Sequence, residues 1–305
     1  MSASAGARAA VGGDGPRRRQ ARLSAAARRV GPYEIGDEIG RGAASRVFAA
    51  RHLASAEWVA FKEFRSRPGT AHEHERFLAE ARILGSMDHP HVVSVRDVIE
   101  DHDTWALVME LVSGGSLRHH IRSGLGLAQA GRVLEDVLCG LGQLARHHVA
   151  HLDIKPDNLL VTSSGRVKIA DFGVAQELPP GRERVAVLLG GTPQYLAPEQ
   201  AAGAPLGTWT DLYAVGILAF ELLVGRPPYA DTLDPVEVMD RHLHDRVPRV
   251  CDLLPGMSTA MADWIGRMVA KTPSDRPESA GVAWQDLETL LTEGLGCSWR
   301  LAAGL

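Results

Sequence analysis

The stretch from His151 to Leu160 constrains the chain most, because it places three kinds of functional side chain within six residues. Asp153 is a carboxylate, Lys155 is an ammonium and Asn158 is a carboxamide, and the apolar pair that follows is typical of a loop that enters a strand. A carboxylate can accept the proton of an attacking hydroxyl, a lysine can neutralise a phosphate, and a carboxamide oxygen suits Mg2+. The alternative is a polar surface turn at which Pro156 ends a helix.

The length of 305 residues is compatible with one large domain or with two lobes. Apolar residues make up 45% and charged residues 23%, as is ordinary for a soluble globular protein. The net charge of -4 is unevenly spread, because residues 1–32 hold seven Arg and one Asp. The remainder of the chain is therefore acidic, and a nucleic-acid partner is not expected.

The N-terminal residues 1–31 are rich in Ala, Arg, Gly and Ser, and we expect them to form a disordered basic tail rather than a signal peptide. The three cysteines have no C-x-x-C spacing, which favours a reducing compartment over disulfides or a zinc site. No apolar run reaches the roughly 18–20 residues of a membrane span. The closest run, Ala214–Val224, contains Glu221 and is expected to be a buried helix.

A glycine-rich turn follows the first predicted strand. The run from Gly40 to Phe48 has the spacing G-x-G-x-x-S-x-V, with Ser45 at the third position. Two glycines allow a tight turn and a close approach of the backbone to a phosphate. An ordinary β-hairpin with glycine at its turn has a similar pattern.

An alternating strand carries Lys62, and a helix is expected from about residue 71 to 86. Three apolar residues of that helix share a face beside Glu80, which makes Glu80 the candidate ion-pair partner of Lys62. Glu73 and Glu75 are alternatives that fall too early in the helix. Taken alone, Lys62 could also be an exposed strand lysine.

The later elements follow in a definite order. A buried strand over Trp105–Val112 runs into a connector, and a long helix is expected over 127–148. Two triplets then follow, Asp171-Phe172-Gly173 and Ala197-Pro198-Glu199. The glutamate of the second triplet and Arg276 are expected to form a buried ion pair.

In this order the motifs resemble those of eukaryotic-type serine/threonine protein kinases of the kind common in bacteria, over about Tyr33–Thr292. The matching positions are Gly40, Gly42, Lys62, Glu80, His151, Asp153, Lys155, Asn158, Asp171-Phe172-Gly173, Ala197-Pro198-Glu199, Asp211 and Arg276. The resemblance implies an α+β, bilobal protein-kinase fold. Residues 32–112 would form a small β-rich N-lobe with one helix and the hinge, 113–293 a larger, mostly helical C-lobe, and 294–305 a short C-terminal tail.

The resemblance also implies ATP with Mg2+, or alternatively Mn2+, in the cleft between the lobes, and transfer to protein serine or threonine hydroxyls. The residues that it assigns to catalysis are Lys62, Glu80, Asp153, Lys155 and Thr192. Those that it assigns to the metal are Asn158 and Asp171. The nucleotide is expected to contact Ile39, Gly40, Arg41, Gly42, Val47, Ala60, Lys62, Met109, Glu110, Val112 and Leu160.

Two departures from the family pattern bear on regulation. Leu152 stands before the catalytic aspartate, where many members have an arginine that grips a phosphate, and Val174–Gly191 contains no Ser, Thr or Tyr. We hypothesise that activity is not gated by phosphorylation in that loop, and that the apolar run Val185–Leu189 pins it by packing or through a partner. The alternative is that Leu152 is a tolerated buried substitution.

Two other functions share parts of the pattern. A pseudokinase scaffold would bind partners without catalysis, but every polar residue needed for catalysis is present. Small-molecule kinases share H-x-D-x-x-x-x-N, but they typically lack a lysine at the position of Lys155 and the Ala197-Pro198-Glu199 segment. We expect a protein substrate, a separate regulatory protein partner and a cytoplasmic, self-contained chain.

Overall fold

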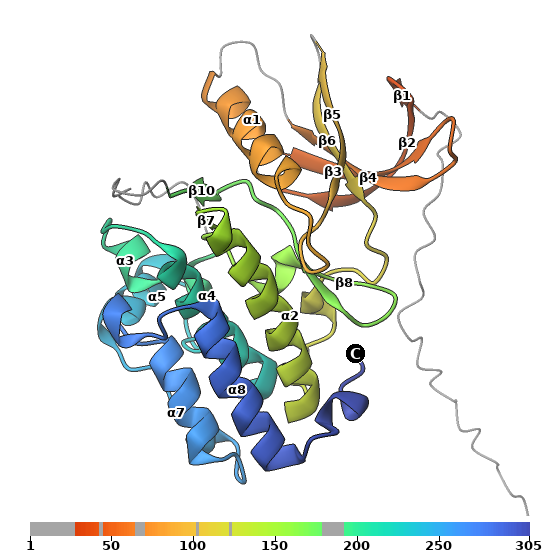
Figure 1. The fold of residues 1–305 in the computed structure, drawn as a ribbon. Coiled ribbons are helices and arrows are strands. Elements are labelled where there is room, and N and C mark those ends of the chain that lie inside the picture. The colour runs from red at the N-terminus through yellow and green to blue at the C-terminus, as the bar shows by residue number, and fades with distance from the viewer. Residues whose placement is uncertain (1–27, 43–44, 65–70, 102–103, 122–123, 179–191) are drawn as a thin grey trace, which may run out of the picture.

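The structure, a computed structural model, has two lobes (Figure 1). The upper lobe is a β-sheet with one helix, and the lower lobe is a bundle of helices. The structure describes residues 28–42, 45–64, 71–101, 104–121, 124–178 and 192–305. The predicted α+β, bilobal architecture is confirmed.

The upper lobe is built on an antiparallel six-stranded sheet with the order β1-β2-β3-β4-β6-β5. Its strands are β1 (Arg28–Val30), β2 (Tyr33–Arg41), β3 (Ser45–His52), β4 (Trp58–Phe64), β5 (Val95–Asp101) and β6 (Thr104–Glu110). The helix α1 (Ala71–Gly85) packs on this sheet through the expected apolar face, in which Phe77, Ile83 and Leu84 are buried. This packing also turns the buried Glu80 toward Lys62 on β4.

The lower lobe holds the remaining helices of the described chain. These are α2 (Leu127–Arg146), α3 (Pro198–Ala201), α4 (Thr208–Val224), α5 (Pro235–His244), α6 (Val250–Leu253), α7 (Thr259–Met268) and α8 (Ala280–Leu295). Short 3-10 turns lie at η1 (Leu117–His119), η2 (Pro156–Asn158), η3 (Pro193–Tyr195), η4 (Pro273–Asp275) and η5 (Trp299–Ala302). Two small antiparallel pairs complete it, β7 (Val149–Ala150) with β10 (Gln176–Glu177), and β8 (Leu159–Val161) with β9 (Val167–Ile169).

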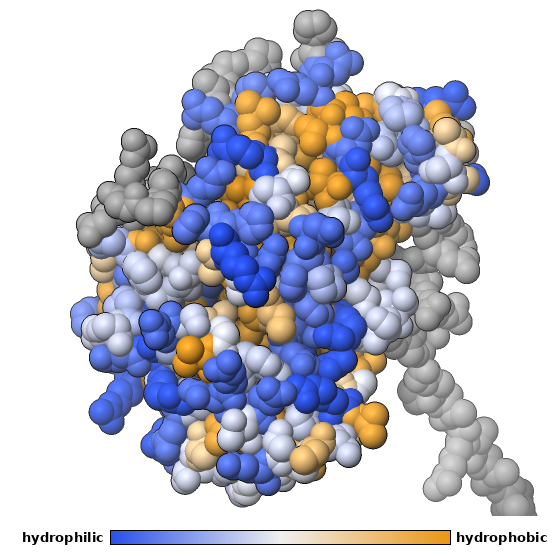
Figure 2. Space-filling model, in the orientation of Figure 1, coloured by the Kyte–Doolittle hydropathy of each residue, from blue (hydrophilic) through white to orange (hydrophobic). Residues whose placement is uncertain are grey.

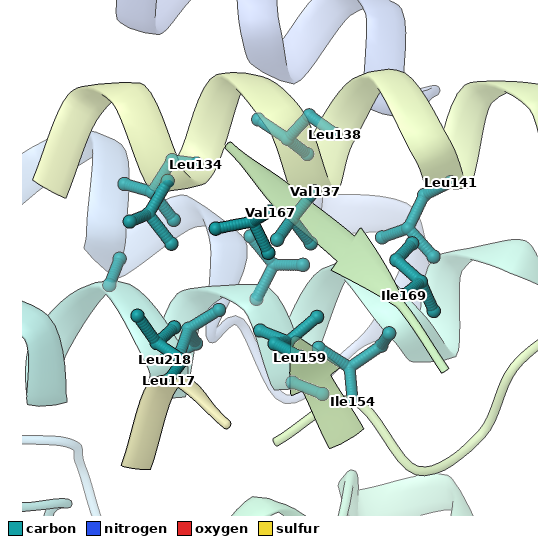
Figure 3. Packing of buried hydrophobic residues seen from close by; sticks show 14 of the residues in the cluster. Leu117, Leu134, Val137, Leu138, Leu141, Ile154, Leu159, Val167, Ile169 and Leu218 are labelled. Atoms are coloured by element: carbon teal, nitrogen blue, oxygen red, sulfur yellow. The ribbon is translucent and has the colours of Figure 1, made fainter. Parts of the chain in front are cut away.

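The core of the lower lobe lies where α2, α4 and the β8–β9 pair meet (Figure 3). Leu134, Val137, Leu138 and Leu141 recur at helical spacing on α2, and all four are buried. Gly140 lets β9 approach this helix closely, because a Cβ there would lie 2.7 Å from a side-chain carbon of Ile169. The core thereby fixes β8, the strand that follows residues 151–158, which are called the catalytic loop here after their expected role.

The outer surface differs between the two lobes in the view of Figure 2, where hydrophobic residues are most visible over the upper lobe and the lower lobe is largely hydrophilic. The predicted buried helix is α4, and every residue from Thr210 to Leu223 on it is buried. Among the described residues, no helix combines the length and the apolar character that crossing a membrane requires.

Both chain ends carry more structure than the sequence indicates. Residues 28–30, within the segment assigned to a disordered tail, form β1 on the edge of the sheet. At the other end, in the segment assigned to a short tail, Trp299 is only 2% exposed. The guanidinium of Arg300 lies over its ring at 4.6 Å from the centroid, and Gln129 donates a hydrogen bond to the carbonyl of Gly304 at 2.9 Å.

Candidate active site

The catalytic loop is held from below by α4. The backbone N–H groups of His151 and Leu152 donate to the buried carboxylate of Asp211 at 2.8 and 2.7 Å. Leu152 has a φ of +65°, in the left-handed region where a branched side chain is strained. The two hydrogen bonds to Asp211 offset that strain, so the loop has one defined conformation.

The three polar residues of the loop contact one another directly. Lys155 Nζ donates to Asp153 Oδ2 at 2.7 Å, and Asn158 Nδ2 donates to the same oxygen at 2.8 Å. Asn158 Nδ2 also lies 2.8 Å from the carbonyl oxygen of Asp153. Within the described residues, Asp153 Oδ1 has no hydrogen-bond partner, so this oxygen is left to accept a proton.

A second polar group lies between the lobes. Lys62 Nζ is 2.6 Å from Glu80 Oε1 and 2.7 Å from Asp171 Oδ1, so the expected ion pair with Glu80 is present. Glu75, one of the alternatives, is exposed, and the side chain of Glu73 lies outside the described residues. The helix α1 and the strand β4 therefore bring Lys62 and Glu80 together from 18 residues apart.

Charge pairing sets the ionisation of this second group. Burial alone would lower the pKa of Lys62, but the carboxylates of Glu80 and Asp171 raise it above its usual value. The cation of Lys62 in turn lowers the pKa of Asp171 to about 2, against the opposing effect of burial. Lys62 is therefore a cation and Asp171 an anion at neutral pH.

Backbone contacts through Ala170 join the two groups. His151 Nε2 donates to the carbonyl of Ala170 at 3.1 Å, and the N–H of Ala170 donates to the carbonyl of Asn158 at 2.9 Å. The ring of His151 also packs edge-on against Phe172, with centroids 4.8 Å apart. Asp171 is thus held beside the catalytic loop.

Two of these side chains fit a hard divalent cation. Asn158 uses its amide nitrogen for Asp153, which leaves Oδ1 as an unpaired acceptor among the described residues. Asp171 has a φ of +62° and a depressed pKa, so it presents an ionised carboxylate beside Lys62. A carboxylate and a carboxamide oxygen suit Mg2+, which completes its shell with water and phosphate oxygens. A cluster of three or more His, Cys, Asp or Glu suited to a metal does not occur in the described ranges.

The residues expected to contact a nucleotide lie on or just after β2, on β3, β4 and β6, in the connector after β6, and on β8. Ile39, Gly40 and Arg41 end β2, and the N–H of Gly42 donates to the carbonyl of Ser45 at 2.9 Å across the turn. The two residues between them, 43–44, lie outside the described part. Five apolar members of the set belong to, or pack against, the main core cluster: Val47, Ala60, Met109, Val112 and Leu160. Ile39, the sixth, is 48% exposed.

The connector between the lobes is fixed by the side chain of Glu110. Its carboxylate accepts from Lys168 Nζ at 2.7 Å and from the N–H of Ser94 at 2.9 Å. The backbone N–H of Glu110 donates to the carbonyl of Ser94 at 3.0 Å. The N–H of Val112 has no hydrogen-bond partner in the described part of the chain, so it is a free donor at the expected adenine position.

Thr192 stands apart from the other predicted catalytic residues. It immediately precedes η3, and its carbonyl accepts from the N–H of Tyr195 at 3.0 Å. The described residues include no hydrogen bond between the side chain of Thr192 and the catalytic loop. The structure therefore brings together Lys62, Glu80 and Asp171, and separately Asp153, Lys155 and Asn158, but it does not add Thr192 to either group.

A partly buried cluster that the sequence pattern does not reveal adjoins η3. Arg118 donates to Tyr195 Oη at 2.7 Å and to Asp157 at 3.0 Å, and it also pairs with Glu221. The hydroxyl of Tyr195 donates to Glu221 as well. Glu221, a lone charge in an apolar run of the sequence, was the one sign that a polar cluster is partly buried here. Its partners Arg118 and Tyr195 lie in distant segments, so the sequence did not identify them.

Leu152 lies in a small apolar cluster with Ala150 and Leu206. Val174 and Leu178, at the start of the loop without hydroxyl residues, pack against this cluster. The strand β10 belongs to the same stretch of chain, and it pairs with β7. The base of the loop is therefore packed against Leu152, whereas the apolar run Val185–Leu189 lies outside the described residues.

The expected long-range ion pair is also present. Arg276 donates to the two carboxylate oxygens of Glu199 at 2.6 and 2.7 Å, and both side chains are buried. Arg276 also donates to the carbonyls of Ala270 and Trp209, each at 2.9 Å. This pair connects the end of the loop to the bottom of the helical lobe.

Comparison with known proteins agrees with this geometry. A serine/threonine-protein kinase PrkC of Bacillus subtilis is 32% identical over 262 residues, which cover 85% of this chain and 40% of the relative. The probable serine/threonine-protein kinase pknA2 of Bifidobacterium longum is 34% identical over 266 residues, covering 85% of this chain and 35% of the relative. The probable serine/threonine-protein kinase PknB of Lactococcus lactis is 32% identical over 269 residues, covering 86% of this chain and 41% of the relative.

The chain thus spans well under half the length of these curated relatives. A family model described as "Protein kinase domain" matches residues 33–286, which include the whole of both polar groups described above. With the bilobal fold, the lysine–glutamate pair and the catalytic loop in place, the chain belongs to the protein kinase domain family.

Proposed function

We propose that the chain is an ATP-dependent protein kinase that phosphorylates serine and threonine hydroxyls. The observation that carries this proposal is the carboxylate of Asp153 beside the Lys62–Glu80–Asp171 group. Its Oδ2 is held by Lys155 and Asn158, and its Oδ1 has no partner among the described residues. The names of the similar bacterial proteins support the serine/threonine assignment.

Each polar residue has one task in this proposal. Asp153 Oδ1 accepts the proton of the protein hydroxyl, while Lys155 faces the transferred phosphoryl group as a point charge. Lys62, oriented by Glu80, holds the α- and β-phosphates. When bound, MgATP supplies the γ-phosphate and the cation that neutralises its charge, and Asn158 and Asp171 are the residues that would hold this cation.

The test is transfer of radiolabel from ATP to dephosphorylated casein in the presence of Mg2+. We expect label on serine and threonine, and a loss of about 100-fold or more in Lys62→Ala, because the variant leaves two carboxylates facing the phosphates without a cation. Arg82→Ala is the matched control and should keep full activity, because it removes only an exposed ion pair between α1 and Glu177.

ATP binding without any transfer would favour the pseudokinase scaffold, and transfer to an aminoglycoside alone would favour a small-molecule kinase. The rate of label transfer with Mg2+, compared with the rate with Mn2+, identifies the preferred metal.

We also propose that phosphorylation of the loop Val174–Gly191 does not gate this activity. The support is that the loop has no hydroxyl side chain and that Val174 and Leu178 pack against Leu152, where a phosphate-binding arginine could stand. Hydrophobic contact stabilises the base of the loop without any modification. A partner protein that acts on the rest of the loop is compatible with this proposal.

Phosphatase treatment is therefore expected to leave the specific activity of the purified chain unchanged. Leu152→Ala should lower the free energy of unfolding by about 2–3 kcal/mol and reduce kcat, because it leaves a cavity under the loop. Leu152→Met, which conserves volume, should lower it by less than about 1.5 kcal/mol. An activating phosphate on Thr192 or Tyr195, with activity lost on its removal, would contradict the proposal.

A further inference from the structure

One helix of the lower lobe reaches η3 through a buried histidine. His242 on α5 is 0% exposed, and its ring packs against Tyr213 and Tyr229, with centroids 5.7 and 5.2 Å away. The hydroxyl of Tyr213 lies 2.8 Å from His242 Nδ1. His242 Nε2 lies 3.1 Å from the backbone carbonyl oxygen of Gln194, which is in η3.

These two contacts define one arrangement of the imidazole. A carbonyl oxygen only accepts, so Nε2 of His242 carries the hydrogen and donates it to Gln194. Nδ1 is then an acceptor, and the hydroxyl of Tyr213 donates to it. Burial, with a smaller effect of the Lys271 cation, lowers the pKa of His242 to about 4, so the ring is neutral at physiological pH.

The helix that carries His242 is itself fixed at this end. Lys271 Nζ donates to the carbonyl of His242 at 2.6 Å and to that of Arg241 at 3.4 Å, close to the C-terminus of α5. A cation there stabilises the unpaired carbonyls of a helix end. The imidazole therefore has a fixed support rather than a mobile one.

The segment that His242 contacts follows the loop described above. Residues 192–196, here called the docking segment, contain η3 and lead into the Ala197-Pro198-Glu199 triplet. On its other side, the side chain of Tyr195 is held by Arg118 and Glu221. Among the described residues, His242 is the only one whose side chain donates a hydrogen bond to a backbone carbonyl of the docking segment.

We propose that His242 is a positioning residue that fixes the backbone of the docking segment for a protein substrate. The inference rests on the proposed kinase function, which would use this segment to receive the polypeptide around the acceptor hydroxyl. His242 does not touch the nucleotide-binding residues described above, so its effect falls on the protein substrate and not on ATP. Loss of the hydrogen bond leaves the partly buried carbonyl of Gln194 without its side-chain donor, or lets η3 shift.

Two isosteric substitutions separate the two hydrogen bonds of the ring. The amide nitrogen of Gln in His242→Gln reaches the position of Nε2 and can still donate to Gln194. The amide of Asn in His242→Asn reaches only the position of Nδ1 and leaves Gln194 without its donor. His244→Asn, two residues along α5 and exposed, is the matched control.

Steady-state kinetics of the full chain with dephosphorylated casein provide the first readout. We expect His242→Asn to raise KM for casein by about three- to tenfold, as for the loss of one hydrogen bond, with KM for ATP unchanged. His242→Gln should recover most of that loss, and His244→Asn should behave as the wild type. If the wild type is active and His242→Asn has the same KM for casein as the wild type, the proposal is overturned.

Hydrogen exchange without any substrate provides a second readout that does not depend on kinase activity. Amides of the docking segment should exchange faster in His242→Asn than in His242→Gln or His244→Asn, and unchanged exchange would overturn the positioning role even if no casein is labelled. A wild type that labels no protein, together with the expected exchange pattern, would reject the proposed function alone. If His242→Asn does not fold, His242→Leu decides, because leucine has a similar volume and cannot donate to the carbonyl of Gln194. It should raise the same exchange and the same KM, and no change in either would reject the proposal.

Discussion

Asp153→Asn is expected to lower kcat by about 10²–10⁴-fold, the typical contribution of a general base. A carboxamide has nearly the size of a carboxylate, and its oxygen can still accept from Lys155 and Asn158, so the loop should keep its conformation. It cannot take a proton from the substrate hydroxyl. Affinity for MgATP, measured by titration in the absence of protein substrate, should stay close to that of the wild type.

The matched control for this substitution lies in the same loop. Asp157 is a half-exposed carboxylate that pairs with Arg118 on the surface side, so Asp157→Asn changes the charge by the same amount without touching the free oxygen of Asp153. We expect it to retain nearly full kcat, since exposed ion pairs contribute little. If Asp153→Asn kept more than about a tenth of the wild-type kcat, the role of base would have to pass to another residue.

The sequence was most informative where function requires a fixed short spacing. Asp153, Lys155 and Asn158 lie within six residues, so the geometry of one loop is enough to bring them into contact. The pairing of Lys62 with Glu80 was also predictable, because a strand followed by an amphipathic helix leaves few ways to bury both charges. The roles of these residues in catalysis stay predictions until the kinetics are measured.

Contacts between distant segments were not predictable in the same way. Arg118 and Glu221 are 103 residues apart, and His242 and Gln194 are 48 residues apart. Each of these side chains could be read as an ordinary surface or core residue, because its partner is selected by the packing of α4 and α5 against η3. The burial of Trp299 likewise depends on α2 and α8 lying side by side, which no local pattern near residue 299 encodes.

Arg276→Met is expected to lower the free energy of unfolding by about 3–5 kcal/mol, because it leaves the carboxylate of Glu199 buried without a counter-charge. For a domain of this size, such a loss corresponds to a fall of about 6–20 °C in Tm. The carbonyls of Ala270 and Trp209 lose a donor as well, which adds to the effect. Thermal and chemical unfolding of the purified variants measure both quantities.

The double variant Glu199→Leu with Arg276→Met separates charge from packing. Removing both charges eliminates the isolated carboxylate, so the double variant should be more stable than Arg276→Met alone. It should still be less stable than the wild type, since the carbonyls of Ala270 and Trp209 no longer receive the guanidinium hydrogen bonds. Arg267→Met, which breaks an exposed pair with Asp286, should change stability by less than about 1 kcal/mol. Equal stability of Arg276→Met and the wild type would mean that Glu199 is neutral or hydrated in the folded chain, and that packing alone connects the loop to the helical lobe.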